Sequence, residues 1–103
     1  MYLTMNRFRI KPGSEAAFEA IWKGRETKLP EVPGFVSFHL MKGETNGEQV
    51  LYASHTMWRS EADFIAWTKS EAFRAAHARA GETEVVYLGP PQLECFEAVQ
   101  SIA

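Results

Sequence analysis

The stretch YLTMNRFRIKPGSEAAFEAIW, from Tyr2 to Trp22, sets a strand directly before a helix. Side chains over 2–10 alternate in character as they do in a β-strand, with the even-numbered residues on one face. The Pro-Gly pair then ends the strand, and Ser14 is a suitable N-cap for a helix that we expect to run to about Lys28. Apolar residues at helical spacing line one side of it: Ala17, Phe18, Ile21, Trp22 and Leu29. We therefore expect this helix to pack on the sheet.

The rest of the chain predicts three more strands and further helix. We expect strands over 35–41 and 50–58, joined by the hairpin loop KGETNGEQ, and a last strand over 93–99. LPEVPG, before the first of these, is a turn because two prolines in four residues cannot continue a helix. A helical stretch begins at Ser60. The order β-α-β-β-α-β indicates an α+β sandwich of the ferredoxin-like type, with helices on one face of an antiparallel sheet.

No helix is left to cover the opposite face of this sheet. Leu3, Met5, Phe35 and Met41 are the apolar side chains that we expect on it. A second copy of the chain is the partner that we expect to cover them.

Length and composition exclude several classes of protein. At 103 residues we expect a single domain, 1–103, and a net charge of −2 argues against nucleic acid as a partner. The only cysteine, Cys95, cannot form an internal disulfide and fits a reducing compartment. No apolar run reaches the roughly 20 residues of a membrane helix, and the alternating N-terminus lacks the apolar stretch of a signal peptide. We therefore expect a cytoplasmic protein without a membrane partner.

The tripeptide SEA occurs three times, beginning at Ser14, Ser60 and Ser70, and each time it opens a helical pattern. Asp63, three residues after Ser60, gives a weaker form of the capping box. Ser70 is suited to cap a separate helix. We therefore expect two helices in this part of the chain, with a break near Lys69.

This break matters for Trp67 and His77. On one straight helix the two residues would lie about 15 Å apart along the axis. A bend between them allows both side chains to approach one pocket. Taken alone, Trp67 fits a core residue that packs on Phe64, and His77 fits either a partly buried histidine near a helix end or a metal ligand.

Other polar residues leave alternatives open. Asn6 lies on the strand face that meets the helices, where its amide either satisfies a nearby backbone group or points at a ligand. His39 and His55 lie on predicted strands and indicate a metal site only weakly, because no His, Cys or carboxylate cluster has metal-ligand spacing. The sequence contains no P-loop, no dinucleotide-binding glycine motif and no nucleophile elbow.

In combination, these residues resemble the IsdG-type haem-degrading monooxygenases of the antibiotic biosynthesis monooxygenase superfamily. The likeness covers nearly the whole chain: NRF in the opening strand, PGF before the second strand, W-x-S-x-x-x-F-x-x-W over 58–67 and S-x-x-F-x-x-A-H over 70–77. The W-S-F-W framework is shared across the superfamily. The set of Asn6, Trp67 and His77 is more specific for haem.

The resemblance implies a role for each of the three. Asn6 is the distal polar residue, Trp67 presses on the porphyrin, and His77 is the axial ligand of the haem iron. Arg25 matches a position that can meet a haem propionate. The expected walls of the haem pocket are Phe8, Trp22, Phe64, Phe73 and Ala76.

The same resemblance implies an enzyme that uses haem as substrate and cofactor, with O2 and an electron-donating reductase, and releases iron and a bilin. It also implies a homodimer in which two sheets form a dimeric α+β barrel. The short loop between Gly81 and Tyr87 leaves open whether the product is biliverdin with CO or a related bilin. Two other functions remain alternatives: a cofactor-free monooxygenase acting on a quinol or polyketide, and a non-catalytic dimer that binds haem.

Overall fold

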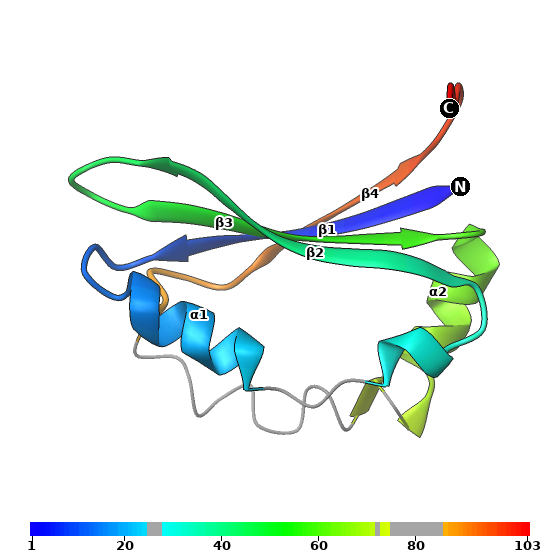
Figure 1. The fold of residues 1–103 in the computed structure, drawn as a ribbon, viewed down its shortest axis with the longest axis horizontal. Helices are drawn as coiled ribbons and strands as arrows, with labels where there is room; N and C mark the ends of the chain where they lie inside the picture. Colours follow the sequence, from blue (N-terminus) through cyan, green and yellow to red (C-terminus); the bar gives the residue numbers. More distant parts are fainter. Residues whose placement is uncertain (25–27, 72, 75–85) are drawn as a thin grey trace.

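The computed structural model describes residues 1–24, 28–71, 73–74 and 86–103. Within them the element order is β1 (Tyr2–Ile10), α1 (Glu15–Lys23), the 3-10 helix η1 (Leu29–Glu31), β2 (Phe35–Thr45), β3 (Val50–Trp58), α2 (Glu61–Thr68) and β4 (Gln92–Glu97). The strands form one antiparallel sheet in the order β2-β3-β1-β4. Both helices lie on the same side of it, α1 under one end and α2 under the other (Figure 1). The expected α+β ferredoxin-like fold is confirmed.

Alternation along β3 shows how the sheet is packed. Val50, Tyr52 and Trp58 are at most 1% exposed. The odd-numbered residues of the strand are only half-buried. An antiparallel sheet with one face on helices produces this pattern, because successive side chains point to opposite faces. The strands β1 and β3 have the bounds expected from the sequence, since the alternating pattern of each strand is present in its own amino-acid sequence.

The main core lies where α1 meets β1 and β3. Phe18 of α1 is fully buried, and its ring centroid lies 5.6 Å from that of Phe8 and 4.6 Å from that of Tyr52. The segment before β4 closes this core, because Val86 is buried and accepts a hydrogen bond from the Lys11 backbone. This packing holds α1 against the sheet.

A second cluster lies under the other end of the sheet, around Trp58. Its indole is fully buried and donates a hydrogen bond of 3.1 Å to the hydroxyl of Thr4. Phe64 of α2 packs on it at 6.0 Å between ring centroids. A buried indole N–H needs such an acceptor, so Thr4 fixes the orientation of the tryptophan.

The helix α1 is shorter than the sequence pattern predicts. It ends at Lys23, with Gly24 as the C-cap, so the expectation of a helix to Lys28 is wrong. Ser14 occupies the N-cap position without a side-chain cap, and instead the Glu15 carboxylate accepts a hydrogen bond of 2.6 Å from the Gly13 backbone. Within the described ranges, every helix is too short or too polar to pass through a bilayer.

A β-bulge changes the faces expected at the start of β2. The pairing register shifts between Phe35, opposite Trp58, and Ser37, opposite Met57. Phe35 consequently packs edge-on against Trp58 on the helix side, with 6.1 Å between ring centroids, and Val36 is 43% exposed. The expected placement of Phe35 on the uncovered face is therefore wrong, because one extra residue in the strand reverses the alternation.

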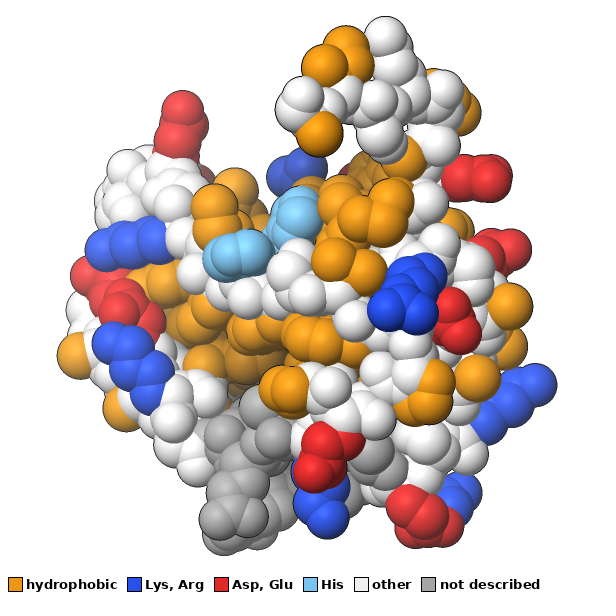
Figure 2. Space-filling view, turned by 45° about the vertical axis from the view of Figure 1, so that its right-hand side comes forward, with side chains coloured by type: hydrophobic (Ala, Val, Ile, Leu, Met, Phe, Trp, Pro, Cys, Tyr) orange, Lys and Arg blue, Asp and Glu red, His pale blue; other side chains and the backbone are white. Residues whose placement is uncertain are grey.

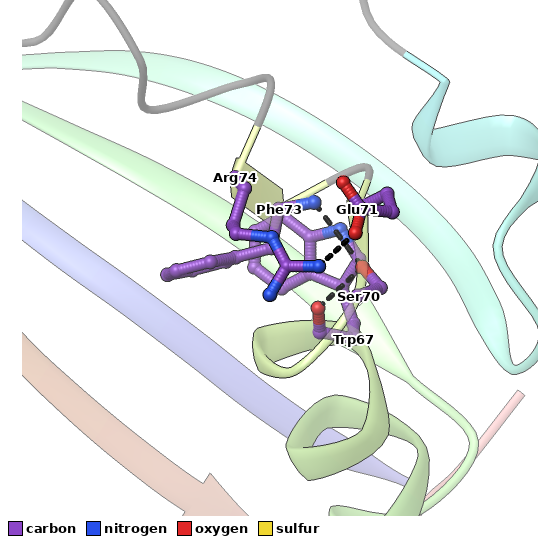
Figure 3. Close-up of polar contacts among 5 residues, drawn as sticks. All are labelled: Trp67, Ser70, Glu71, Phe73 and Arg74. Atoms are coloured by element: carbon purple, nitrogen blue, oxygen red, sulfur yellow. Dashed lines mark hydrogen bonds and ion pairs between the residues drawn. The ribbon is translucent and has the colours of Figure 1, made fainter.

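The predicted break between two helices is confirmed. The helix α2 begins after Ser60, whose hydroxyl accepts from the Asp63 N–H at 3.2 Å, and it ends at Thr68 with Lys69 as C-cap. The hydroxyl of Ser70 then accepts from the Phe73 N–H at 3.1 Å and donates to the Trp67 carbonyl at 2.6 Å (Figure 3). One serine thus closes the first helix and caps the next.

Gly34, within the PGF sequence, gives a stability prediction. Its φ is +83°, and a Cβ there would overlap the side chain of Asp63, which holds the Ser60 cap. Gly34→Ala is therefore expected to lower the free energy of unfolding by about 2–4 kcal/mol, measured by urea denaturation. Gly47→Ala is the control, because no atom lies within 4 Å of its Cβ position. Equal stability of the two variants would contradict the steric account.

Candidate functional site

The helix-side face of the sheet carries one aromatic cluster at each end. In the α1 cluster, Trp22 lies 5.5 Å from Phe8 and 5.9 Å from Phe38 between ring centroids, nearly parallel to the latter. Phe8 and Trp22, two predicted walls of the pocket, are thus in contact. Phe38 joins them from β2.

The α2 cluster contains the other predicted aromatic walls. Trp67 lies 4.9 Å from Phe73, at 87° between ring planes, and 6.3 Å from Phe64. Residues six apart on one straight helix would be separated by about 9 Å along its axis and would point to different sides. The break at Lys69 is therefore what brings Phe73 onto Trp67 (Figure 3).

Asn6 lies on the strand between the two clusters. It shares the helix-side face of β1 with Thr4 and Phe8, and it is paired with Ser54 of β3 and Leu93 of β4. Ser54 is buried, and Asn6 is half-buried. Its side-chain amide makes no hydrogen bond to any other residue that the structure describes. The amide is therefore able to serve a ligand on this face.

The predicted site residues divide into four groups. Phe8 and Trp22 belong to the α1 cluster, and Phe64, Trp67 and Phe73 belong to the α2 cluster; no ring contact between described residues joins the clusters. Asn6 stands on the sheet between them. Arg25, Ala76 and His77 lie outside the described residues, so their places remain predictions.

A pocket of about 310 Å³ opens beside the α1 cluster, between α1, β2 and β3. Its residues are Glu19, Trp22, Lys23, Phe38, Leu40, Lys42 and Tyr52. Apolar walls with a few charged groups at the rim are typical of sites for small molecules. Only Trp22 among these was predicted from the sequence. The strand alternation of Phe38, Leu40 and Tyr52 was the available signal, but their meeting with α1 depends on the hairpin register.

Two tyrosines near the clusters have raised pKa values. The Tyr52 hydroxyl donates to the Glu19 carboxylate at 2.5 Å, and burial together with this hydrogen bond raises the Tyr52 pKa well above its ordinary value. A hydrogen bond with Cys95, burial and the Glu61 carboxylate raise the pKa of Tyr2 to about 12. Both phenols thus remain protonated donors at neutral pH.

The raised pKa of Tyr52 predicts a loss of stability in alkali. Because the folded-state pKa exceeds the ordinary value of 10.0, the stabilisation is complete below that pH and decreases as the pH rises toward the folded pKa. Tyr52→Phe should therefore flatten the decline in unfolding free energy between about pH 9.5 and 11, measured by denaturation at several pH values. Parallel curves for the variant and the parent protein would contradict this linkage.

Comparisons with known proteins agree with these features. The profile of the antibiotic biosynthesis monooxygenase family matches residues 1–79. The chain belongs to the antibiotic biosynthesis monooxygenase family. A heme oxygenase (staphylobilin-producing) from Staphylococcus haemolyticus is 33% identical over 84 residues, which are 81% of this chain and 79% of that protein. Its counterpart from Staphylococcus saprophyticus is 34% identical over 82% of this chain and 80% of its own length.

Solved structures of similar proteins share the fold over nearly the whole chain. The heme-degrader MhuD from Mycobacterium tuberculosis, with two hemes bound in its active site, superposes with a TM-score of 0.75 and 26% identity, covering 100% of both chains. SnoaB, a cofactor-independent oxygenase from Streptomyces nogalater, has a TM-score of 0.72 at 20% identity over 98% and 95% of the two chains, which supports the fold alone. The resemblance predicted from the motifs is thereby confirmed.

Proposed function

We propose that this member of the antibiotic biosynthesis monooxygenase family is a haem-degrading monooxygenase that cleaves the porphyrin ring with O2 and external electrons and releases iron and a bilin. The observation that carries the proposal is the half-buried Asn6 amide, without a partner among the described residues, between two aromatic clusters. Heme oxygenases and a heme-degrader among the relatives support the choice of substrate.

The described residues suit a flat apolar substrate. A porphyrin needs a slot between sheet and helices with aromatic walls and few polar groups. Phe8 and Trp22 supply one such wall, and Trp67 with Phe73 supplies the other. Ala76 and Arg25 complete the proposed pocket, the latter toward a propionate.

Each residue of the proposed triad has a distinct task. His77 holds the iron through a neutral imidazole nitrogen. Asn6 donates amide hydrogens on the opposite side of the ring without acting as a strong acid. Trp67, braced by Trp58 at 5.3 Å between ring centroids, crowds the macrocycle and orients it toward the reacting side. Haem itself supplies the redox chemistry once it is bound.

We further propose that the protein acts as a homodimer in the cytoplasm, with a separate reductase as electron donor. On the sheet face away from the helices, apolar side chains are partly or largely exposed, among them Met41 at 54% and Phe96 at 48%. A second copy would bury this face and form the dimeric α+β barrel. The single cysteine, Cys95, is free and exposed, which suits a reducing compartment.

Titration of the apoprotein with haemin tests the function. We expect a Soret band that saturates at one haem per chain and then disappears under ascorbate or a reductase, with release of iron. Absence of the band would favour a cofactor-free oxygenase, and a band that persists would favour a non-catalytic haem-binding protein. A mass spectrum of the product then distinguishes biliverdin from a related bilin.

A further inference from the structure

Two histidines meet on the face of the sheet away from the helices. His39 of β2 is paired directly with His55 of β3, and their ring centroids lie 6.1 Å apart at 66° between planes. Figure 2 shows the histidine side chains next to one another, with hydrophobic side chains around them. The two residues are distant in the chain and only the hairpin register pairs them, which is why the sequence alone indicates a metal site only weakly.

A methionine continues this row across the sheet. Met5 of β1 is paired with His55 on its other side, so the three side chains occupy adjacent positions on one face. Directly opposite residues in an antiparallel sheet have Cβ atoms about 4.5–5.5 Å apart. His55 is the middle residue of the three. The long thioether of Met5 and the imidazoles of His39 and His55 are therefore able to reach one point above the middle strand.

The His55 ring has an unused ligand atom. Its Nδ1 is buried and has no hydrogen-bond partner among the described residues. A buried polar atom without a partner costs free energy, which coordination of a metal ion by the ring would offset. Two imidazoles on one ion, with metal–nitrogen distances near 2.0 Å, have centroids roughly 5–6.4 Å apart. The observed separation lies within this range.

The donor types select the metal. Among the described residues no group of three or more His, Cys, Asp or Glu side chains is placed to hold an ion, so the usual ligand set for zinc is missing. The third donor available to the histidine pair is a thioether, which favours Cu(I). Arg7, in the next row, is neutralised by an ion pair of 2.5 Å with Glu94, which reduces its repulsion of a cation.

We propose that His39, His55 and Met5 form a Cu(I)-binding site on the sheet face away from the helices. The site is separate from the proposed haem pocket and does not depend on haem degradation. Its ligands come from three neighbouring strands of one chain, so the proposed site does not require a second copy of the chain.

The test is an anaerobic titration of the full chain, without haem, against a chromophoric Cu(I) chelator. The background is Cys95→Ser, because an exposed thiolate binds Cu(I) and Cys95 is paired with Thr4 on the helix-side face. We expect one Cu(I) per chain. His39→Gln and His55→Gln should each weaken binding by about 100-fold, and Met5→Leu by about tenfold.

Two controls make the assignment specific. Met57→Leu changes a methionine of the same face in the next row, and it should alter the affinity for Cu(I) by less than about twofold. His77→Ala should likewise alter this affinity by less than about twofold. X-ray absorption should show a sulfur neighbour that Met5→Leu removes. If His55→Gln does not fold, His39→Gln and Met5→Leu decide, since His39 is exposed. Any one of three results would overturn the proposal. These are an unchanged affinity for Cu(I) in His39→Gln, a loss of Cu(I) binding in His77→Ala, and zinc binding that is as tight as Cu(I) binding.

Discussion

His77→Ala is expected to abolish axial coordination of the haem iron and to reduce haem degradation by about 100-fold or more. The reason is that the proposed imidazole bond would fix both the position and the electronic state of the iron. The two histidines that the structure describes, His39 and His55, lie on the opposite face of the sheet and cannot replace it. The measurement combines the Soret and electron paramagnetic resonance spectra with single-turnover degradation under ascorbate.

Rescue distinguishes a ligand from a merely structural histidine. Added imidazole should restore the coordinated spectrum of the His77→Ala variant, while its far-ultraviolet circular dichroism should match that of the parent protein. A variant with unchanged iron coordination would show that His77 is not the ligand. A variant that is unfolded would instead call for His77→Gln, in which the side-chain volume is largely kept.

The second large effect is expected from Trp67→Ala. This change should leave haemin binding within about tenfold of the parent but slow turnover by at least about tenfold, because the bulk that crowds the ring is gone. Trp67→Phe should recover part of the rate. Resonance Raman spectra should report a flatter porphyrin in the Ala variant. Equal turnover in all three proteins would remove the steric role of Trp67.

Loss of stability has to be separated from this loss of rate. Trp67 packs against Trp58 and Phe73, so Trp67→Ala is also expected to lower the free energy of unfolding by about 2–4 kcal/mol. Phe35→Leu is the matched control, because Phe35 contacts the same Trp58 from the sheet but has no place in the proposed pocket. It should reduce stability in urea denaturation without slowing haem degradation.

The predicted helices and strands agree with the structure where the prediction depends on residues close together in the chain. The bounds of β1 and β3 follow from alternation within each strand, and the break at Lys69 follows from serine caps that act over three residues. The length of α1 was overestimated, because an apolar stripe continues past Gly24 in the sequence although the helix ends at Lys23. Periodicity does not report where a helix C-cap will form.

The candidate site shows the same division. The face of Asn6 and the aromatic spacing on α2 could be predicted from the chain alone. The pocket that joins Tyr52 to Glu19 could not, because it requires a strand and a helix to meet across the sheet. The bulge at Val36 could not be predicted from the sequence either, since an extra residue in a strand is defined only by the pairing with its partner strand.

The sequence by itself determined the element order and the helix-side face of the central strands. It is also the source of the set of Asn6, Trp67 and His77 on which the haem proposal rests. The tertiary structure alone decided which strands became neighbours, and with them the bulge that moved Phe35 onto Trp58 and the pairing of His39 with His55. The physical reason is range: caps and alternation act between residues close in the chain, whereas register is fixed by the burial of side chains that meet only after the sheet has formed.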